Sequence, residues 1–433
     1  MTTVKAVRGT RDLLPPETEL WNRIETTARR VFARYNFGEI RTPIFEDTSL
    51  FARSVGEETD IVAKEMYTWE DRARAQSEKA QSLTLRPENT AGVVRAYIEH
   101  NLGESGQLQK LYYIGPQFRR ERPQKGRYRQ FWQIGAEVIG PPFAGSESPL
   151  RDAEVLEMLA TLLDELGITG WRLELNSVGS AADRARYNGV LRAALVEVAP
   201  KMCGDCQRRA VTNPLRVLDC KIPEDQPIID ALPKITDSLD QESKDHFAAV
   251  TAALDAAGVE YKLNPRLVRG LDYYTRTTFE FTHGGLGAQN ALLGGGRYDG
   301  LSEAIGGPKA PGIGFAIGLD RLVLTLQSTD LDQKSAARPA HAYIAPLGEK
   351  LNAAALVLAR ELRRAGLSIE LGDGSFRLKK SFETADKVAR RIVILGEDEL
   401  QSGILTVKDF LTGAQSKIPR EELVAHLKRP AGE

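Results

Sequence analysis

The feature that most constrains the fold is a pair of alternating segments joined by a short basic connection. The segments are LYYIGPQFR (111–119) and RQFWQIGAEVIG (129–140). In the second, two sets of residues alternate: Trp132, Ile134, Ala136 and Val138 against Phe131, Gln133, Gly135 and Glu137. Successive side chains of a strand point to opposite faces, so one face is apolar and the other carries an amide and a carboxylate. The pattern predicts a long antiparallel hairpin with one core face and one functional face.

The connection, FRRERPQKGRYRQF (118–131), gathers Arg and Lys residues around a single acid, Glu121. The whole chain has a formal net charge of −1, so this positive charge is local. Charge runs commonly form a solvated surface, but like charges this dense repel each other unless an anion neutralises them. Because the planar guanidinium group fits phosphate oxygens, the run favours a phosphate-binding loop, for ATP or for RNA.

Length and composition are typical of an ordinary globular protein. A chain of 433 residues, 42% hydrophobic and 27% charged, is long enough for two or three domains. The N-terminus lacks the apolar core of a signal peptide, and Asp320 and Arg321 interrupt the most apolar late segment (312–327). Three cysteines cannot form a closed disulfide framework. We therefore expect a cytoplasmic protein without a membrane partner.

Periodicity divides the chain into regions. Apolar residues at helical spacing predict a helix over about 17–37, ended by Gly38 in a left-handed conformation. Residues 180–262 are charged, have a helical pattern and look like an insertion between sheet elements. The polar segment 328–339 is expected to be a linker, and the alternating strands and helices of 340–433 predict a small α/β domain with a largely parallel sheet.

Two further motifs each have a structural and a functional interpretation. RPENTAG (86–92) lies where a strand gives way to a helix, so Asn89 or Thr90 could cap that helix. Alternatively, Glu88 and Thr90 offer acceptors to an ammonium group. The glycine-rich segment 285–300 fits neither a dinucleotide fingerprint nor a Walker motif, and it is either a turn-rich connection or a place where backbone approaches a ring or a phosphate closely.

The cysteines raise the question of a metal site. Cys203, Cys206 and Cys220 could supply three zinc ligands. No fourth ligand is evident nearby, because His246 is far along the chain. We expect free cysteines and no protein-bound metal.

Taken together, these motifs resemble the class II aminoacyl-tRNA synthetases, and specifically the histidyl-tRNA synthetase family. NFGEIRTPIFED (36–47) is similar to motif 1, whose proline belongs to a dimer interface, residues 118–138 to motif 2, and GIGFAIGLDRL (312–322) to motif 3. RLVRGLDYYTRTTFE (266–280) and residues 86–92 resemble two signatures peculiar to the histidine enzymes. The resemblance runs through essentially the whole chain.

The resemblance implies a fold, an activity and partners. The fold is an α+β catalytic domain over 1–327, built on an antiparallel sheet flanked by helices, with the helical insertion at about 180–262 and an anticodon-binding α/β domain over 340–433. The activity is that of a histidine–tRNA ligase, which converts L-histidine and ATP into histidyl-adenylate and pyrophosphate. It then transfers histidine to the 3′-terminal adenosine of tRNA(His). The resemblance also implies a homodimer, and Mg²⁺ bound through the phosphates of ATP.

The resemblance also assigns residues by their positions in the motifs. The catalytic arginines are Arg119, Arg269 and Arg321. The histidine-binding set is Glu88, Asn89, Thr90, Arg119, Gln133, Glu137, Arg269, Tyr273 and Tyr274. The ATP-binding set is Arg119, Glu121, Arg127, Gly294, Gly295, Gly296 and Arg321. Contacts to tRNA are expected from Arg122, Lys125, Arg129, Lys379 and Lys380.

One departure and two alternatives accompany these assignments. The family commonly reads R-P-E-G-T, and Asn89 stands here in place of the glycine, which puts the local backbone geometry in question. The first alternative is a catalytically silent paralogue that acts as a regulatory subunit, a type that lacks the anticodon domain and has eroded motifs. The second is a nucleotide-dependent RNA-binding protein that transfers no amino acid.

Overall fold

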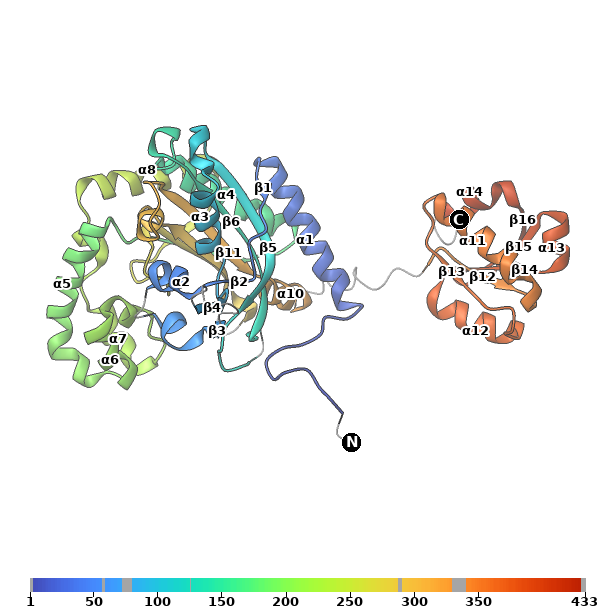
Figure 1. Ribbon diagram of the computed structural model, residues 1–433, viewed down its shortest axis with the longest axis horizontal. Coiled ribbons are helices and arrows are strands. Elements are labelled where there is room, and N and C mark those ends of the chain that lie inside the picture. Colours follow the sequence, from blue (N-terminus) through green and yellow to red (C-terminus); the bar gives the residue numbers. More distant parts are fainter. Residues whose placement is uncertain are drawn as a thin grey trace. The chain divides into compact units, whose positions relative to one another are not determined.

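A computed structural model describes residues 3–56, 59–71, 80–124, 126–286, 290–328 and 340–429. The chain divides into two compact units, Met1–Ser335 and Ala336–Glu433, which Figure 1 shows with their elements labelled. The predicted linker, 328–339, lies outside the described residues except for Ser328, which ends a helix.

An eight-stranded sheet forms the centre of the first unit, in the order β1-β5-β6-β11-β10-β9-β7-β8. Only β1/β5 and β7/β8 are parallel among its described pairings. The strands are β1 (Gly38–Glu39), β5 (Gln109–Phe118), β6 (Gln130–Ile139), β7 (Trp171–Ser177), β8 (Tyr261–Leu263), β9 (Thr275–His283), β10 (Ala291–Arg297) and β11 (Gly312–Gly318). The predicted hairpin is confirmed as β5 and β6, with Leu111 opposite Glu137 and Gly115 opposite Gln133.

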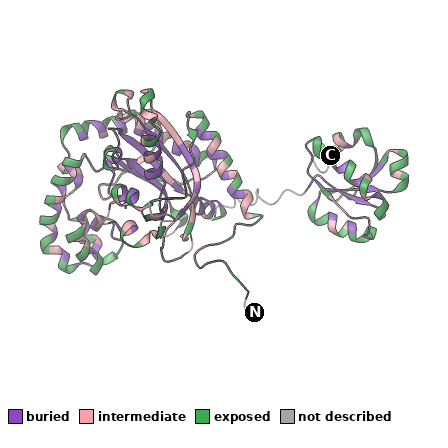
Figure 2. Cartoon of the chain, viewed as in Figure 1, coloured by how far each residue is buried: buried purple, intermediate pink, exposed green. Residues whose placement is uncertain are grey.

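Helices cover the apolar face of this sheet. They are α1 (Glu17–Arg34), α4 (Pro149–Glu165), α8 (Gln241–Ala257) and α10 (Leu319–Ser328). Ile134, Ala136 and Val138 of β6 lie in the core beneath them, as the strand alternation predicts. Figure 2 shows this buried layer in purple. The predicted fold class, a largely antiparallel sheet flanked by helices, is thus confirmed.

The first helix ends earlier than its sequence pattern predicts. It stops at Arg34, and Asn36, not Gly38, adopts the left-handed conformation, with φ 60°. Gly38 is the first residue of β1. Asparagine tolerates this backbone region because its short side chain forms local hydrogen bonds, so it replaces the expected glycine.

Smaller elements lie on the polar side of the sheet. They are a three-stranded sheet in the order β2-β4-β3 (Phe45–Asp47, Gln81–Leu85 and Tyr67–Asp71) and the helices α2 (Thr48–Val55), α3 (Thr90–Glu99) and α9 (Leu301–Ala304). Val94 and Tyr97 of α3 share a buried cluster with Ile139 of β6. The start of α3 is therefore held beside the polar face of the hairpin.

The helices of the predicted insertion fall into two cores. Helices α5 (Ala181–Val198), α6 (Gly204–Thr212) and α7 (Gln226–Asp230) surround a small core of their own, which includes Tyr187, Leu191 and Cys206. In contrast, Val250 and Leu254 of α8 belong to the large core under the central sheet. A charged helical pattern does not reveal which core a helix joins.

The second unit is a five-stranded sheet with helices, in the order β13-β12-β14-β15-β16. Its strands are β12 (Ala342–Pro346), β13 (Ile369–Leu371), β14 (Arg391–Leu395), β15 (Ile404–Asp409) and β16 (Gln415–Pro419), and its helices are α11 (Asn352–Arg364), α12 (Leu378–Val388), α13 (Glu397–Ser402) and α14 (Leu423–Lys428). The expectation of a largely parallel sheet is only half right, since β14/β15 and β15/β16 are antiparallel. The short connection 410–414 makes a hairpin instead of a crossover. Within the described parts of both units, no helix has the length and apolarity needed to cross a membrane.

Candidate active site

A cavity of about 420 Å³ lies on the polar side of the central sheet. Seven of the residues singled out from the sequence line it: Arg119, Glu121, Arg127, Gln133, Arg269, Gly294 and Arg321. Arg119 comes from the hairpin, Arg269 from the segment before β9, and Arg321 from the start of α10. The fold thus gathers around one cavity three arginines that are far apart in sequence.

Hydrogen bonds and ring contacts hold these arginines in place. Arg119 donates through Nε to the Pro87 carbonyl (2.9 Å) and lies over the Phe131 ring, 5.2 Å from its centre. Arg269 forms an ion pair with Glu280, and Arg321 donates through Nη1 to the Ala291 carbonyl (2.6 Å). Burial, together with repulsion from Arg127, lowers the pKa of Arg321. An anion in the cavity would relieve this repulsion.

Glu121 lies between two of the basic side chains of the loop. Its carboxylate is 3.2 Å from Nη1 of Arg127 and 3.9 Å from Nη1 of Arg119. Asp219, Glu280 and Asp320 also line the cavity, so the excess of basic over acidic side chains there is small. What suits the cavity to a phosphate group is the planar guanidinium groups of its arginines.

Beyond Gln133 on the same face of β6 lies Glu137, a fully buried carboxylate. Thr90 donates its hydroxyl to Oε1 of Glu137 (2.7 Å), and Tyr298 donates its hydroxyl to Oε2 (2.7 Å). Burial raises the pKa of Glu137 to about 8 in spite of both bonds. A buried acid with polar partners is poised to bind a polar ligand.

Small residues of the neighbouring strands make room for this carboxylate and for the cavity. In the sheet register Glu137 is opposite Gly314, which is opposite Gly296. A Cβ atom at Gly314 would overlap the Glu137 carboxylate, so only glycine fits there. A Cβ at Gly294 would lie 2.6 Å from the Arg269 guanidinium group. A Cβ at Gly295 would point to the other face of β10 and meet Phe279 in the core, and the assignment of Gly295 to ATP stays a prediction.

The motif 86–92 is arranged around Glu88. Its carboxylate accepts hydrogen bonds from the backbone N–H groups of Thr90 (2.7 Å) and Ala91 (3.0 Å). Glu88 therefore caps α3, in place of the side-chain cap expected from Asn89 or Thr90. Asn89 has φ −117°, which any residue adopts, so the exchange for glycine introduces no strain. Its Oδ1 accepts from the Thr42 hydroxyl (2.6 Å).

Aromatic rings close the buried end of the site. Tyr273 and Tyr274 pack against each other with ring centres 4.7 Å apart, and Tyr273 lies 6.0 Å from Tyr298. Among the described residues, Oε1 of Gln133 and Nε of Arg269 are buried without a hydrogen-bond partner in the protein. Both atoms belong to residues that line the cavity, where a polar ligand would pair with them.

The residues expected to contact tRNA lie in different settings. Arg122 is exposed, whereas Arg129 donates to the Arg8 carbonyl (3.2 Å), and Lys125 lies outside the described residues. In the second unit Lys379 and Lys380 are exposed on α12, with Nζ of Lys380 3.8 Å from the centre of the Phe376 ring.

Comparison with known proteins gives this arrangement a family. The family model described as histidyl-tRNA synthetase matches residues 9–322. The chain belongs to the histidyl-tRNA synthetase family. A second model, described as anticodon binding domain, matches residues 341–429.

Individual members of the histidyl-tRNA synthetase family resemble the chain over almost all of its length. It is 71% identical over 431 residues to the histidine–tRNA ligase of Koribacter versatilis, covering 98% of this chain and 96% of that one. It is 57% identical over 426 residues to the histidine–tRNA ligase of Solibacter usitatus, covering 98% and 99%. The crystal structure of apo S. aureus histidyl-tRNA synthetase matches with a TM-score of 0.80 and 38% identity, covering 99% and 100%.

Several residues around the cavity and around Glu137 were not predicted from the sequence. Tyr298 and Gly314 contact Glu137 or make room for it, and neither was singled out. Arg11 was also missed. It donates to Asp320 (2.9 Å) and lies 4.8 Å from the centre of the Tyr128 ring. Tyr298 lies two residues after the glycines of GGGRYDG, and this was the one local signal available.

The raised pKa of Glu137 predicts a pH-dependent effect on stability. Between the usual glutamate pKa and about 8, the folded chain keeps this proton while the unfolded chain has lost it. Stability is therefore lost as pH rises through this window, by up to roughly 5 kcal/mol, and the loss is complete above the folded pKa. Glu137→Gln removes the buried ionisable group and with it this loss of stability at high pH. We expect the variant to unfold at a higher temperature than the wild type near pH 9, with the difference shrinking toward pH 5.

Thermal unfolding at several pH values measures this difference directly. Glu99→Gln is the matched control, because Glu99 is exposed and pairs only at the surface with Arg95. A stability difference for Glu137→Gln that did not vary with pH would contradict the raised pKa.

Proposed function

We propose that the histidine–tRNA ligase activity of this chain is carried out in the arginine-lined cavity and by the buried polar groups around Glu137. The chain activates L-histidine with ATP, giving histidyl-adenylate and pyrophosphate. It then transfers histidine to the 3′-terminal adenosine of tRNA(His). The observation that carries the proposal is the convergence of Arg119, Arg269 and Arg321 on one cavity, which Gln133 also lines, four residues before Glu137 on the same face of β6.

In the first step the carboxylate of histidine attacks the α-phosphorus of ATP. A carboxylate is already ionised at neutral pH, so the step needs no general base. It needs positioning and cations that stabilise charge on the phosphoryl oxygens. We assign Arg119 and Arg269 to the α-phosphate and Arg321 to the γ-phosphate. Mg²⁺ enters as part of the MgATP substrate.

The remaining cavity residues suit the rest of the nucleotide. Glu121 and Arg127 border it from the hairpin loop. Gly294 leaves open the space beside Arg269 that a side chain would fill. We assign these residues to the phosphates and the adenosine.

Histidine recognition is assigned to two groups of residues, one for the α-ammonium group and one for the imidazole ring. We assign Glu88, Thr90 and Gln133 to the α-ammonium group. Oε1 of Gln133 is buried without a partner, and the Glu88 carboxyl group has acceptor capacity beyond the two backbone N–H groups that it binds. Glu137 and Tyr274, with Tyr273 nearby, bracket the imidazole.

Specificity follows from the chemistry of the imidazole ring. Neutral imidazole offers one N–H donor and one nitrogen acceptor, which a carboxyl group and a hydroxyl group can satisfy together. A site built on such a pair rejects amino acids that lack it by roughly 10⁴–10⁵-fold. We therefore expect no need for an editing activity.

In the second step the terminal ribose hydroxyl of tRNA attacks the acyl carbon of the adenylate. The ester bond forms as the bond to AMP breaks, and we assign the proton of the hydroxyl to the phosphate of the departing AMP. Arg122 and Arg129 of the loop, with Lys125, are assigned to the acceptor end of tRNA. Lys379 and Lys380 are assigned to the anticodon region. The resemblance of residues 36–47 to motif 1 supports a homodimer, and the reaction supports a cytoplasmic location.

Histidine-dependent ATP–pyrophosphate exchange tests the proposal. We expect purified protein to exchange label with L-histidine and not with the other amino acids, and to charge tRNA(His) when it is added. Protein that folds but catalyses no exchange would instead support the silent regulatory paralogue. The match of residues 341–429 to the anticodon binding domain speaks against that alternative, since such paralogues lack this domain.

A further inference from the structure

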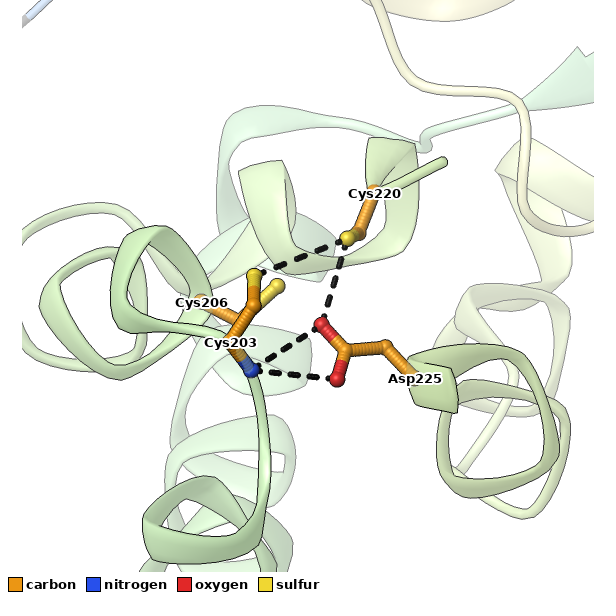
Figure 3. Close-up of side chains that lie close together, drawn as sticks. All are labelled: Cys203, Cys206, Cys220 and Asp225. Carbon is orange, nitrogen blue, oxygen red and sulfur yellow. Dashed lines mark hydrogen bonds between the residues drawn. The ribbon is translucent and has the colours of Figure 1, made fainter. Parts of the chain in front are cut away.

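Three cysteines and an aspartate meet inside the helical insertion, outside the proposed active site. The ligand atoms of Cys203, Cys206, Cys220 and Asp225 all lie within 4.8 Å of one another. Figure 3 shows the three sulfur atoms and the carboxylate turned toward a common centre. The sequence offered three candidate ligands, and the histidine considered as a fourth, His246, is far along the chain. The fourth group is a carboxylate, five residues after Cys220.

Two of the six distances between these atoms are close to the edges of a tetrahedron around one ion, and all six are within 4.8 Å. Sγ of Cys203 is 3.9 Å from Sγ of Cys220, and Sγ of Cys220 is 3.3 Å from Oδ2 of Asp225. A zinc–sulfur bond of about 2.3 Å and a zinc–oxygen bond of about 2.0–2.2 Å place tetrahedral sulfurs roughly 3.8 Å apart and sulfur and oxygen roughly 3.5 Å apart. A disulfide requires sulfurs about 2.05 Å apart, so the present spacing belongs to free thiols.

The backbone fixes the four groups before any ligand arrives. Cys203 is the N-cap residue of α6 and Cys206 lies in its first turn. Cys220 follows the 3-10 helix η5 (Pro214–Asp219), and Asp225 ends the 3-10 helix η6 (Pro223–Asp225). Both oxygens of Asp225 accept from the Cys203 backbone N–H (3.1 and 3.2 Å), which joins the two segments.

The site is buried in a core that is small for its length of chain. Cys206, Cys220 and Asp225 are at most 4% exposed, and Cys203 is half-buried. Cys206 and Cys220 are members of the insertion's own core, in which no described residue belongs to a strand. Small cores of this kind commonly depend on a metal or on covalent cross-links. Three thiolates and a carboxylate also need a cation to be stable together when buried.

We propose that Cys203, Cys206, Cys220 and Asp225 bind one Zn²⁺ ion as a structural site. Thiolate-rich tetrahedral sites select zinc among the common divalent ions, and hard ions such as Mg²⁺ prefer oxygen ligands. Four protein ligands leave no open position for a reacting water, which suits a structural role. An iron–sulfur cluster would place several atoms between its cysteines and needs more space than 4.8 Å allows. The proposal replaces the expectation from sequence that no metal is bound.

The metal would also support one wall of the active-site cavity. Asp219 and Lys221, the two neighbours of Cys220, both line that cavity. Val268, next to Arg269, packs against the same insertion core that contains Cys206 and Cys220. Loss of the ion is therefore expected to loosen this wall as well as the insertion.

Metal analysis of the full-length chain, purified without a metal-affinity tag, tests the proposal. We expect about one zinc ion per chain to survive dialysis against buffer. After removal of zinc under reducing conditions, Co²⁺ should bind at the same stoichiometry and give thiolate-to-cobalt charge-transfer absorption with the intense d–d bands of a tetrahedral site. These measurements use the wild type, so they do not depend on a variant that folds.

Two variants locate the site. Asp225→Asn and Cys206→Ser should each lose at least about tenfold in zinc affinity, since each removes an anionic ligand. Asp205→Asn is the matched control, because Asp205 lies between Cys203 and Cys206 in the sequence but is exposed and pairs with Arg208. It should keep its zinc. Thiol labelling should show three reactive cysteines only after zinc is removed.

Three outcomes would overturn the proposal. The first is wild-type protein that binds neither zinc nor Co²⁺ at micromolar concentration. The second is cobalt bound without thiolate absorption, which would place the ion elsewhere. The third is a Cys203–Cys220 disulfide found by mass spectrometry in freshly purified, unreduced protein. None of these bears on the ligase activity, which the exchange assay measures separately.

Discussion

Replacing Glu137 with glutamine is expected to lower kcat/KM for histidine in the exchange reaction by about 10–10²-fold, because leaving a buried hydrogen-bonding group unpaired costs roughly 1–3 kcal/mol. Glutamine keeps the size of the side chain and can still accept from Thr90. It cannot, however, share a proton with the imidazole as a carboxyl group does. KM for ATP should stay near that of the wild type, since the Glu137 carboxyl contacts Thr90 and Tyr298 and does not line the arginine cavity. Steady-state exchange assays in which histidine and ATP are varied separately measure both expected effects.

The control for this variant is Glu99→Gln, an exposed change of the same type in the same unit. It should leave both kinetic constants unchanged. If Glu137→Gln raised KM for ATP as much as KM for histidine, the assignment of Glu137 to the imidazole would be wrong. If Glu137→Gln also showed the pH-dependent gain in stability predicted above, the loss of activity would not be a folding defect.

The part of the site carried by the hairpin could be predicted because it depends on local periodicity. In β6 a repeat of two places Gln133 and Glu137 on one face and Ile134 and Ala136 on the other, and the structure confirms both faces. The basic loop could be identified from its charged residues alone. Such features require only neighbouring residues, so they can be read without knowing which strands pair.

Contacts between distant segments could not be predicted in this way. Gly314 is needed opposite Glu137 because β11 pairs with β6, and that strand order is not visible in either segment. Asp225 escaped notice because an aspartate near cysteines is common, and only the fold of η5 and η6 turns it toward them. The left-handed residue after α1 was wrongly predicted for a different reason. Both Asn36 and Gly38 are residue types that can end a helix, and the structure uses Asn36.

Replacing Arg269 with glutamine is expected to reduce kcat for exchange by about 10²–10³-fold, the usual effect of removing one donor that stabilises charge in a transition state. Histidine and ATP should still bind, because Glu137 and the other arginines remain. The change should therefore appear in kcat far more than in either KM. Arg269→Lys keeps a positive charge but loses the planar fork, so it should restore only part of the rate. If kcat stayed unchanged and kcat/KM fell only because KM for ATP rose, a role in the transition state would be contradicted.

Gly294 offers a way to displace this arginine without removing it. A Cβ atom at Gly294 would lie 2.6 Å from three atoms of the Arg269 guanidinium group, so Gly294→Ala should push that group aside. We expect a loss of about tenfold in kcat, from misplacement of a positioned cation. Because the effect passes through Arg269, it should disappear in the Arg269→Gln background, and the double variant should be no slower than Arg269→Gln alone. If the two losses multiplied instead, the added methyl group would act mainly on the neighbouring nucleotide, and displacement of Arg269 would not be the cause of the loss.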